Sequence, residues 1–184
     1  MNNSRKYIIL IAYLLAIGLS SVAQQVRPVY PVKPLTQEDI SRRQRIPEWG
    51  TNTRSASSAV LPEGVDNSTL KYFPPVFSQL GNSCSQASGV RYVYTYELNR
   101  LLDRAADSPE HIFNYHFTWN YLNEGNDQGS HPELGYNMMK VAGAVTLSDM
   151  NDESAATSST TWMTGYDKYL RAMNYRVKSY SKFT

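Results

Sequence analysis

Residues 74–88 read Pro74-Pro75-Val76-Phe77-Ser78-Gln79-Leu80-Gly81-Asn82-Ser83-Cys84-Ser85-Gln86-Ala87-Ser88 and hold the only cysteine of the 184-residue chain. Pro75 favours an extended backbone before it, and Gly81 with Asn82 predicts a turn. Beyond the turn, apolar residues recur at three- and four-residue spacing and predict a helix from about Cys84 to Arg104. These residues are Ala87, Val90, Tyr94, Leu98 and Leu101. We expect this helix to be well buried, because three further residues widen its apolar face: Tyr92, Val93 and Tyr96.

The predicted turn places the Cys84 thiol at the start of a helix, with Ser83 as the candidate N-cap. Backbone N–H groups and the helix dipole favour the thiolate there, and the thiolate is the nucleophilic form of cysteine. Cys84 is therefore the strongest candidate for chemistry in the chain. The alternative is a structural thiol, since free cysteine is among the most buried residue types.

The first 23 residues have the pattern of a secretory signal. Arg5 and Lys6 precede an apolar run, Tyr7–Leu19, which is too short for a comfortable membrane span. Small residues before and at Ala23 predict cleavage near that position. We therefore expect an exported protein, periplasmic or extracellular, without stable membrane insertion. An uncleaved membrane anchor is the alternative.

Charge and composition exclude several classes of function. The predicted signal contains two of the 18 basic residues and none of the 16 acidic ones, so the rest of the chain is formally neutral. A nucleic-acid-binding surface would need a clustered basic face, so no nucleic-acid partner is expected. Asp149, Asp152 and Glu153 lack the spacing and the glycine of a calcium loop, which favours a solvated loop. The sequence predicts no metal and no cofactor.

Residues 24–69 read as a proline- and serine-rich leader or linker, and the folded part is expected at 70–184. Within the leader only Thr36–Arg45 has helical character, with Thr36 as a possible cap and acidic residues in the first turn. A short inhibitory pro-region, a flexible tether and a strap over the domain all stay open for this leader, and its sequence favours the tether or the strap.

Three further segments have a recognisable pattern. Ile112–Asn123 alternates with period two but also has a helical face, so strand and helix both remain open. Pro132–Ala142 predicts a helix that stops at Gly143, with Leu134, Met138 and Val141 on its apolar face. Trp162–Lys178 predicts another helix, and the stretch 149–160 reads as a polar loop.

The segment around Cys84 resembles the nucleophile segment of papain-like cysteine peptidases. In that family a Pro-Val pair precedes a glutamine, a glycine-rich turn and a Ser-Cys pair that opens a long central helix. The matching residues here are Pro75-Val76, Gln79, Gly81, Ser83-Cys84 and Ala87. The turn Leu80–Cys84, and the stretches 96–99 and 116–120, resemble exported bacterial members of the type found in Bacteroidetes. The resemblance covers roughly residues 70–180.

This resemblance implies an α+β papain-like fold, of which the chain would hold mainly the helical left-hand lobe, with its long central helix starting at Cys84. It implies that Cys84 is the nucleophile and that the side-chain amide of Gln79 stabilises the oxyanion. The implied partner is a peptide or protein substrate, and the implied chemistry needs no cofactor.

Three features depart from the family pattern. Gln79 precedes Cys84 by five residues, where the family usually has six, and Ser85 replaces the usual aromatic residue. The family's catalytic His and Asn lie about 130–150 residues after the nucleophile. We therefore expect a chain truncated before them, with the β-rich lobe missing. Of the histidines present, His116 reads as packed among aromatics, while His131 and His111 read as a solvated loop residue and a surface residue.

The sequence thus predicts an exported papain-like cysteine peptidase that hydrolyses peptide bonds through a Cys84 thiolate and a thioester. Two alternatives stay open. One is a secreted, non-catalytic binding or surface protein that keeps the helical lobe and lines a groove with aromatic side chains. The other is a cysteine-nucleophile acyl transferase of the transglutaminase-like kind, which would share the half-site and differ in substrate.

Overall fold

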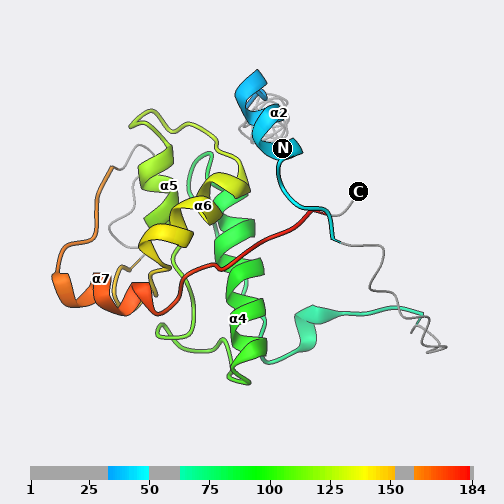
Figure 1. The fold of residues 1–184 in the computed structure, drawn as a ribbon. Helices are drawn as coiled ribbons and strands as arrows, with labels where there is room; N and C mark the ends of the chain where they lie inside the picture. Colours follow the sequence, from blue (N-terminus) through cyan, green and yellow to red (C-terminus); the bar gives the residue numbers. More distant parts are fainter. Residues whose placement is uncertain (1–32, 50–62, 152–159, 183–184) are drawn as a thin grey trace, which may run out of the picture. The chain divides into compact units, whose positions relative to one another are not determined.

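A computed structural model describes residues 33–49, 63–151 and 160–182, all of which belong to one unit, Pro31–Thr184. Helices dominate these residues, and their β structure consists of two isolated bridges, as Figure 1 shows. This helical content agrees with the expected helical lobe. The predicted signal and its cleavage site lie outside the described residues. Within the described ranges, no helix has both the length and the apolar character needed to span a bilayer.

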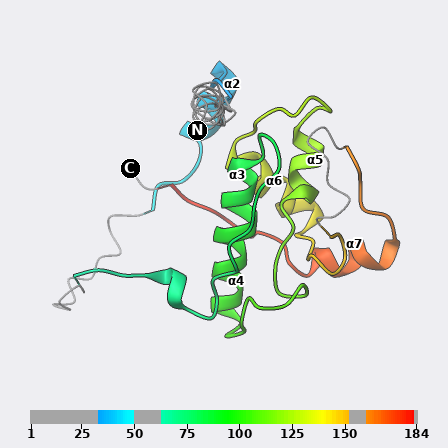
Figure 2. The same ribbon diagram turned by 180° about the vertical axis from the view of Figure 1, so that it is seen from behind.

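The central helix begins at Cys84, as predicted, and ends at Leu101, a few residues earlier than expected. It consists of α3 (Cys84–Gln86), a π-helical segment η3 (Ala87–Tyr94) and α4 (Thr95–Leu101), which follow one another without a break in Figure 2. The hydroxyl of the buried Thr95 donates to the Val90 carbonyl, five residues back, at 3.2 Å. The same hydroxyl accepts the Phe113 N–H at 3.1 Å, so the widened helix is tied to a neighbouring segment.

The central helix is buried along one face over its whole length. Ala87 and Val90 are in the core and Thr95 and Asn99 on α4 are fully buried, whereas Val93 and Leu101 are 53% and 78% exposed. The expectation of a well-buried helix is therefore wrong for the face that carries Val93 and Leu101. Near the start of the helix, α5 (His116–Leu122) packs against α3, and α6 (Pro132–Ala142) packs against α3 and η3.

The remaining predicted elements are confirmed with changes. For Ile112–Asn123 the helical alternative holds from His116, where α5 begins, and the strand alternative is reduced to one isolated antiparallel bridge between Phe113 and Thr146. The predicted helix Trp162–Lys178 is the shorter α7 (Tyr166–Met173). Helix α6 has the predicted bounds and stops at Gly143, whose φ of 81° suits glycine. A side chain at Gly143 would overlap the Ala172 carbonyl, so this stop also lets α6 approach α7.

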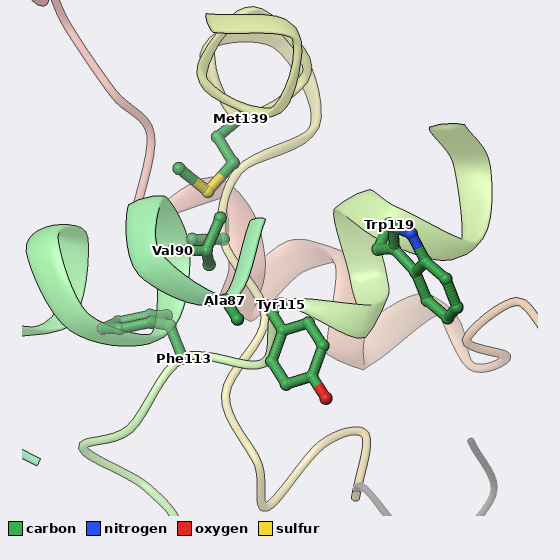
Figure 3. Close-up of a cluster of buried hydrophobic side chains, with 7 residues drawn as sticks. Ala87, Val90, Phe113, Tyr115, Trp119 and Met139 are labelled. Carbon is green, nitrogen blue, oxygen red and sulfur yellow. The ribbon is translucent and has the colours of Figure 1, made fainter. Parts of the chain in front are cut away.

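The main core lies between the central helix, α5 and α6 (Figure 3). Met139 on α6 is fully buried and points towards Val90, whereas Val141 is 77% exposed. The predicted apolar face of α6 is therefore wrong at Val141, whereas Met138 is partly buried against a second core cluster. The face that carries Met139 and Gly135 is turned inward instead, because Gly135 has no side chain and lets α6 approach the central helix closely.

The predicted leader helix is α2 (Gln37–Gln44), with Thr36 as its N-cap. Thr36 and Asp39 form a reciprocal capping box, which confirms the predicted start of this helix. After α2, the chain makes a parallel bridge to the C-terminal segment, which Figure 1 shows meeting it. Trp49 donates to the Lys182 carbonyl at 2.9 Å, and Lys182 donates to the Pro47 carbonyl at 3.0 Å. These contacts favour a strap over a tether for residues 36–49.

A short 3₁₀ turn, η2 (Asn67–Thr69), precedes the segment that leads to Cys84. The carboxylate of Asp66 caps it by accepting the Ser68 N–H at 2.9 Å. Residues 74–80 then run without regular secondary structure to the turn. The chain therefore reaches Cys84 through an irregular segment whose position depends on tertiary contacts.

Candidate functional site

The turn before Cys84 is clamped by a residue from a distant loop. Gly81 has a φ of 55°, and a side chain there would overlap the Asp127 carboxylate. That carboxylate accepts the Asn82 N–H at 2.9 Å, and the Asn82 side chain donates to the Asp127 carbonyl at 2.7 Å. Glycine at position 81 is thus required both by the backbone conformation and by the close approach of Asp127.

Two further hydrogen bonds hold the same turn. The Ser83 hydroxyl donates to the Leu80 carbonyl at 2.6 Å, and the Leu80 N–H donates to the Tyr115 hydroxyl at 3.3 Å. Ser83 occupies the N-cap position, as predicted, but its side chain makes no capping hydrogen bond. The Ser83 hydroxyl therefore stabilises the turn, and the first N–H groups of the central helix are left to other acceptors.

Cys84 is exposed and is the first residue of the central helix. Among the described residues, no acceptor is recorded for its backbone N–H. A thiol and an N–H donor therefore lie together at the positive end of the helix dipole. This exposure argues against the alternative that Cys84 is a buried structural thiol.

Gln79, the predicted oxyanion donor, is also exposed and lies on the same turn. Its side-chain amide donates to the Gly81 carbonyl at 3.3 Å. Within the described part of the chain, no hydrogen bond joins Gln79 to Cys84. The structure thus places both predicted residues on one short turn, with the Gln79 amide directed to its own backbone.

The two residues after Cys84 are held by a second loop. The Ser85 hydroxyl donates to the Ser130 carbonyl, and the Gln86 amide donates to the Ser130 hydroxyl and the His131 carbonyl, both at 3.0 Å. The sequence analysis missed this role of Gln86, Ser130 and His131. A signal was present for Gln86, because it lies four residues before Val90 and places a polar side chain on the buried face.

None of the three histidines has a recorded contact with Cys84. His116 is fully buried against Tyr115 and Trp119, which confirms the packed reading. His111 is half-buried, and its Nδ1 lies 2.9 Å from the Ala105 carbonyl. His131 is buried, so its reading as a solvated loop residue is wrong.

His131 is buried because α2 packs over it. Its Nδ1 lies 3.1 Å from the Arg43 guanidinium, and its Nε2 lies 3.9 Å from the Asp39 carboxylate. Arg43 also forms an ion pair with the buried Glu133 at 2.7 Å. Hydrogen bonds from the Thr36 backbone and side chain hold the pKa of Asp39 at about 2. Asp39 therefore stays ionised beside the His131 ring.

A groove of about 730 Å³ lies away from this site, between the C-terminal half of the central helix and residues 174–181. Apolar and aromatic side chains line most of it, among them Val93, Leu98, Leu101 and Tyr175.

In the described ranges, no group of three His, Cys, Asp or Glu side chains is arranged to hold a metal ion. Comparison of the chain with protein-family models, with curated proteins and with solved structures finds no match.

Proposed function

We propose that Cys84 is the nucleophile of an exported, papain-like cysteine peptidase. One observation carries the proposal. An exposed thiol opens the central helix on a turn that Asp127, Ser83 and Tyr115 hold in place. The resemblance of the Pro75–Ala87 stretch to the nucleophile segment of that family supports the same assignment.

In the proposed reaction, the Cys84 thiolate attacks the carbonyl carbon of a peptide bond and forms a C–S bond. The negative charge that develops on the carbonyl oxygen is stabilised by the Cys84 N–H. The Gln79 amide would join it after releasing the Gly81 carbonyl. The C–N bond then breaks and the amine leaves with a proton taken from water, which is left as hydroxide. Water hydrolyses the thioester, which yields a carboxylic acid and restores the thiol.

The proposal gives no acid–base role to the three histidines. His116 is packed in an aromatic cluster, His131 is held by α2, and His111 contacts the Ala105 carbonyl. The exposure of the Cys84 thiol supports the nucleophile part of the proposal, whereas the Gln79 amide is bonded to the Gly81 carbonyl. The proposal is tested on the nucleophile part first, through the reactivity of the thiol.

The decisive test is the rate at which iodoacetamide alkylates Cys84 at pH 6, in the native protein and in the same protein unfolded in urea. Because Cys84 is the only cysteine, mass spectrometry reads its modification directly. If Cys84 is an activated nucleophile, we expect it to react at least about threefold faster in the native state than in the unfolded state. Cys84→Ser is the control for modification at other side chains.

A native rate equal to or below the unfolded rate would overturn the assignment of Cys84 as an activated nucleophile. A second experiment measures how fast a peptidyl epoxide modifies Cys84. Selective modification requires that the protein recognises the peptide part of the epoxide. Preferential capture of the peptidyl epoxide over its peptide-free analogue supports a peptide substrate. Equal capture would point to an acyl transferase with another substrate.

The apolar groove along residues 174–181 favours a second candidate, a secreted protein that binds polypeptides without cutting them. Binding to a reduced, carboxymethylated protein, measured by calorimetry, separates the two functions. A binding protein keeps its affinity in Cys84→Ala and loses it in Leu98→Asp, whose side chain lines the groove. A peptidase loses turnover in Cys84→Ala.

A further inference from the structure

The segment after α7 is extended and lies along the central helix. Residues 176–181 have no regular secondary structure, and Figure 1 draws them in red as a continuous stretch that passes this helix. Tyr175 and Val177 pack against the main core, whereas Arg176 and Lys178 are exposed. Side chains that alternate between two faces in this way are typical of a β-strand. The exposure pattern therefore indicates a strand-like segment with one face on the core.

The backbone of this segment is paired at its end. Lys182 donates to the Pro47 carbonyl and accepts the N–H of Trp49, which makes the parallel bridge of the fold. For residues 176–181, no backbone hydrogen bond is recorded within the described part of the chain. Unpaired N–H and C=O groups on an extended segment form an edge to which another strand can add. An open edge thus lies directly before the bridge.

This segment forms one wall of the groove of about 730 Å³. The C-terminal half of the central helix forms the other wall, where the apolar side chains of Val93 and Leu101 are exposed. When a peptide adds to a sheet edge, main-chain hydrogen bonds give affinity and pockets take its alternate side chains. The groove offers both features, so its geometry matches an extended polypeptide.

The charged residues that line the groove have a basic excess. Arg100, Arg176 and Lys178 are cationic, and Glu97 is the one acidic residue among the lining residues that the structure describes. Glu97 already pairs with Arg100 at 2.9 Å. No ion pair is recorded between Arg176 or Lys178 and another described residue. Since complementary charge selects partners, the groove favours an acidic ligand.

We propose that this groove binds an extended, acidic segment of a partner protein, which adds as a β-strand beside residues 176–181. Alternate side chains of the added strand face the helix wall at Leu101, and acidic side chains between them lie near Arg176 and Lys178. The inference does not depend on Cys84. It rests on the second candidate function only in taking the groove as a polypeptide site, and it names the class of polypeptide.

The first experiment measures binding of a fluorescein-labelled peptide of alternating glutamate and valine by fluorescence polarisation. The same peptide with lysine in place of glutamate is the control for charge. Both are titrated with the full chain as wild type and as Cys84→Ala, so that cleavage of the peptide cannot be mistaken for release. We expect the glutamate peptide to bind at least about tenfold more tightly than the lysine peptide to both proteins.

N-methylation of the glutamate peptide tests the strand pairing. The N–H groups of successive residues in a strand point to opposite sides, so only every second N–H can pair with the edge. Methyl groups on one alternate set of N–H groups should therefore abolish binding, and methyl groups on the other set should leave it. Loss with neither set, or equal loss with both, would overturn strand addition.

Variants at exposed positions test the two walls. Leu101→Asp and Val141→Asp are a matched pair, because the two side chains are 78% and 77% exposed and only Leu101 lines the groove. Leu101→Asp should weaken binding about tenfold or more through lost apolar contact, and Val141→Asp should match the wild type. Arg176→Glu and Lys178→Glu should each weaken binding at least about threefold. Arg45→Glu, at an exposed position outside the groove, should not.

Two outcomes would assign the groove to another occupant and overturn the inference. Displacement of the labelled peptide by decanoate at a lower concentration than by unlabelled peptide would indicate a site for acyl chains. A wild-type dimer in sedimentation experiments that Leu101→Asp dissociates, without any binding of the peptide, would indicate a second copy of this chain. Equal affinity for the glutamate and lysine peptides, or full binding to Leu101→Asp, would also overturn it.

The outcomes keep the inference apart from the proposed functions. If the glutamate peptide does not bind while Cys84 reacts faster than in the unfolded chain, the inference fails and the nucleophile stands. If the peptide binds and Cys84 is not activated, the nucleophile fails and the inference stands. Binding of the reduced, carboxymethylated protein without preference for the glutamate peptide would support the second candidate function and overturn the acidic ligand class.

Discussion

The Oε1 atom of Gln86 occupies the space that Gly135 leaves by having no side chain. This contact joins the first turn of the central helix to α6, and it lies two residues from Cys84. The amide of the same side chain donates to Ser130 and His131 at 3.0 Å. Gln86 thus joins the start of the central helix to α6 and to the loop before it.

A methyl group at position 135 should therefore disturb this joint. We expect Gly135→Ala to destabilise the protein by about 1–3 kcal/mol, the cost of overpacking a filled site. Urea unfolding followed by circular dichroism measures the change. Gly64→Ala is the matched control, because nothing lies within 4 Å of an added Cβ there. Equal stability of the two variants would show that Gln86 moves aside freely.

The Asp127 clamp on the turn makes a separate prediction. Asp127→Ala leaves the Asn82 N–H without its acceptor, and we expect a loss of about 1–3 kcal/mol in unfolding free energy. Because the turn carries Cys84, the native alkylation rate should move towards the rate of the unfolded chain. Asp107→Ala, at an exposed position, is the control and should stay within about 0.5 kcal/mol of wild type. An unchanged alkylation rate in Asp127→Ala would mean that the turn keeps its shape without the clamp.

The inward face of α6 is tested by two neighbouring truncations. Met139 is fully buried, so Met139→Ala should cost about 2–5 kcal/mol through lost contacts and a cavity. Val141 is 77% exposed, and Val141→Ala should change stability by less than about 0.5 kcal/mol. Both values come from the same denaturant titration. A larger effect at Val141 than at Met139 would restore the face expected from the sequence.

Asp39 makes the stability of the α2 region depend on pH. The pKa of Asp39 is lowered from 3.8 to about 2 when the protein folds, chiefly by the hydrogen bond from the Thr36 backbone. Its contribution is therefore fully present above about pH 4 and is lost as the pH falls towards 2. Asp39→Asn should be less stable than wild type at pH 5 and close to it near pH 2.

Urea titrations at several pH values between 5 and 2 measure this convergence. Glu110→Gln, an exposed carboxylate outside the cluster, should show a constant difference from wild type over the same range. If the gap between Asp39→Asn and wild type is independent of pH, the capping box does not stabilise the ionised Asp39.

Local features were predictable from the sequence because they depend on residues close in the chain. The Thr36 cap of α2, the Gly81 turn, the start of the central helix at Cys84 and the stop at Gly143 all agree with the structure. Capping and positive φ are decided within a few residues. For the candidate site, the sequence identified the exposed turn with Cys84 and Gln79, but not the residues that hold it.

Tertiary structure decided the features that depend on distant partners. His131 is buried because α2, 88 residues earlier, packs against it, and the Asn82 turn is held by Asp127, 45 residues later. The inward face of α6 follows from the close approach at Gly135, which hydrophobic spacing alone does not reveal. The sequence by itself determined the start of α2 and of the central helix, both bounds of α6 and the Gly81 turn, but not the bounds of α7. Long-range packing decided which faces are buried and what surrounds Cys84, because burial is set by elements that local propensities cannot place.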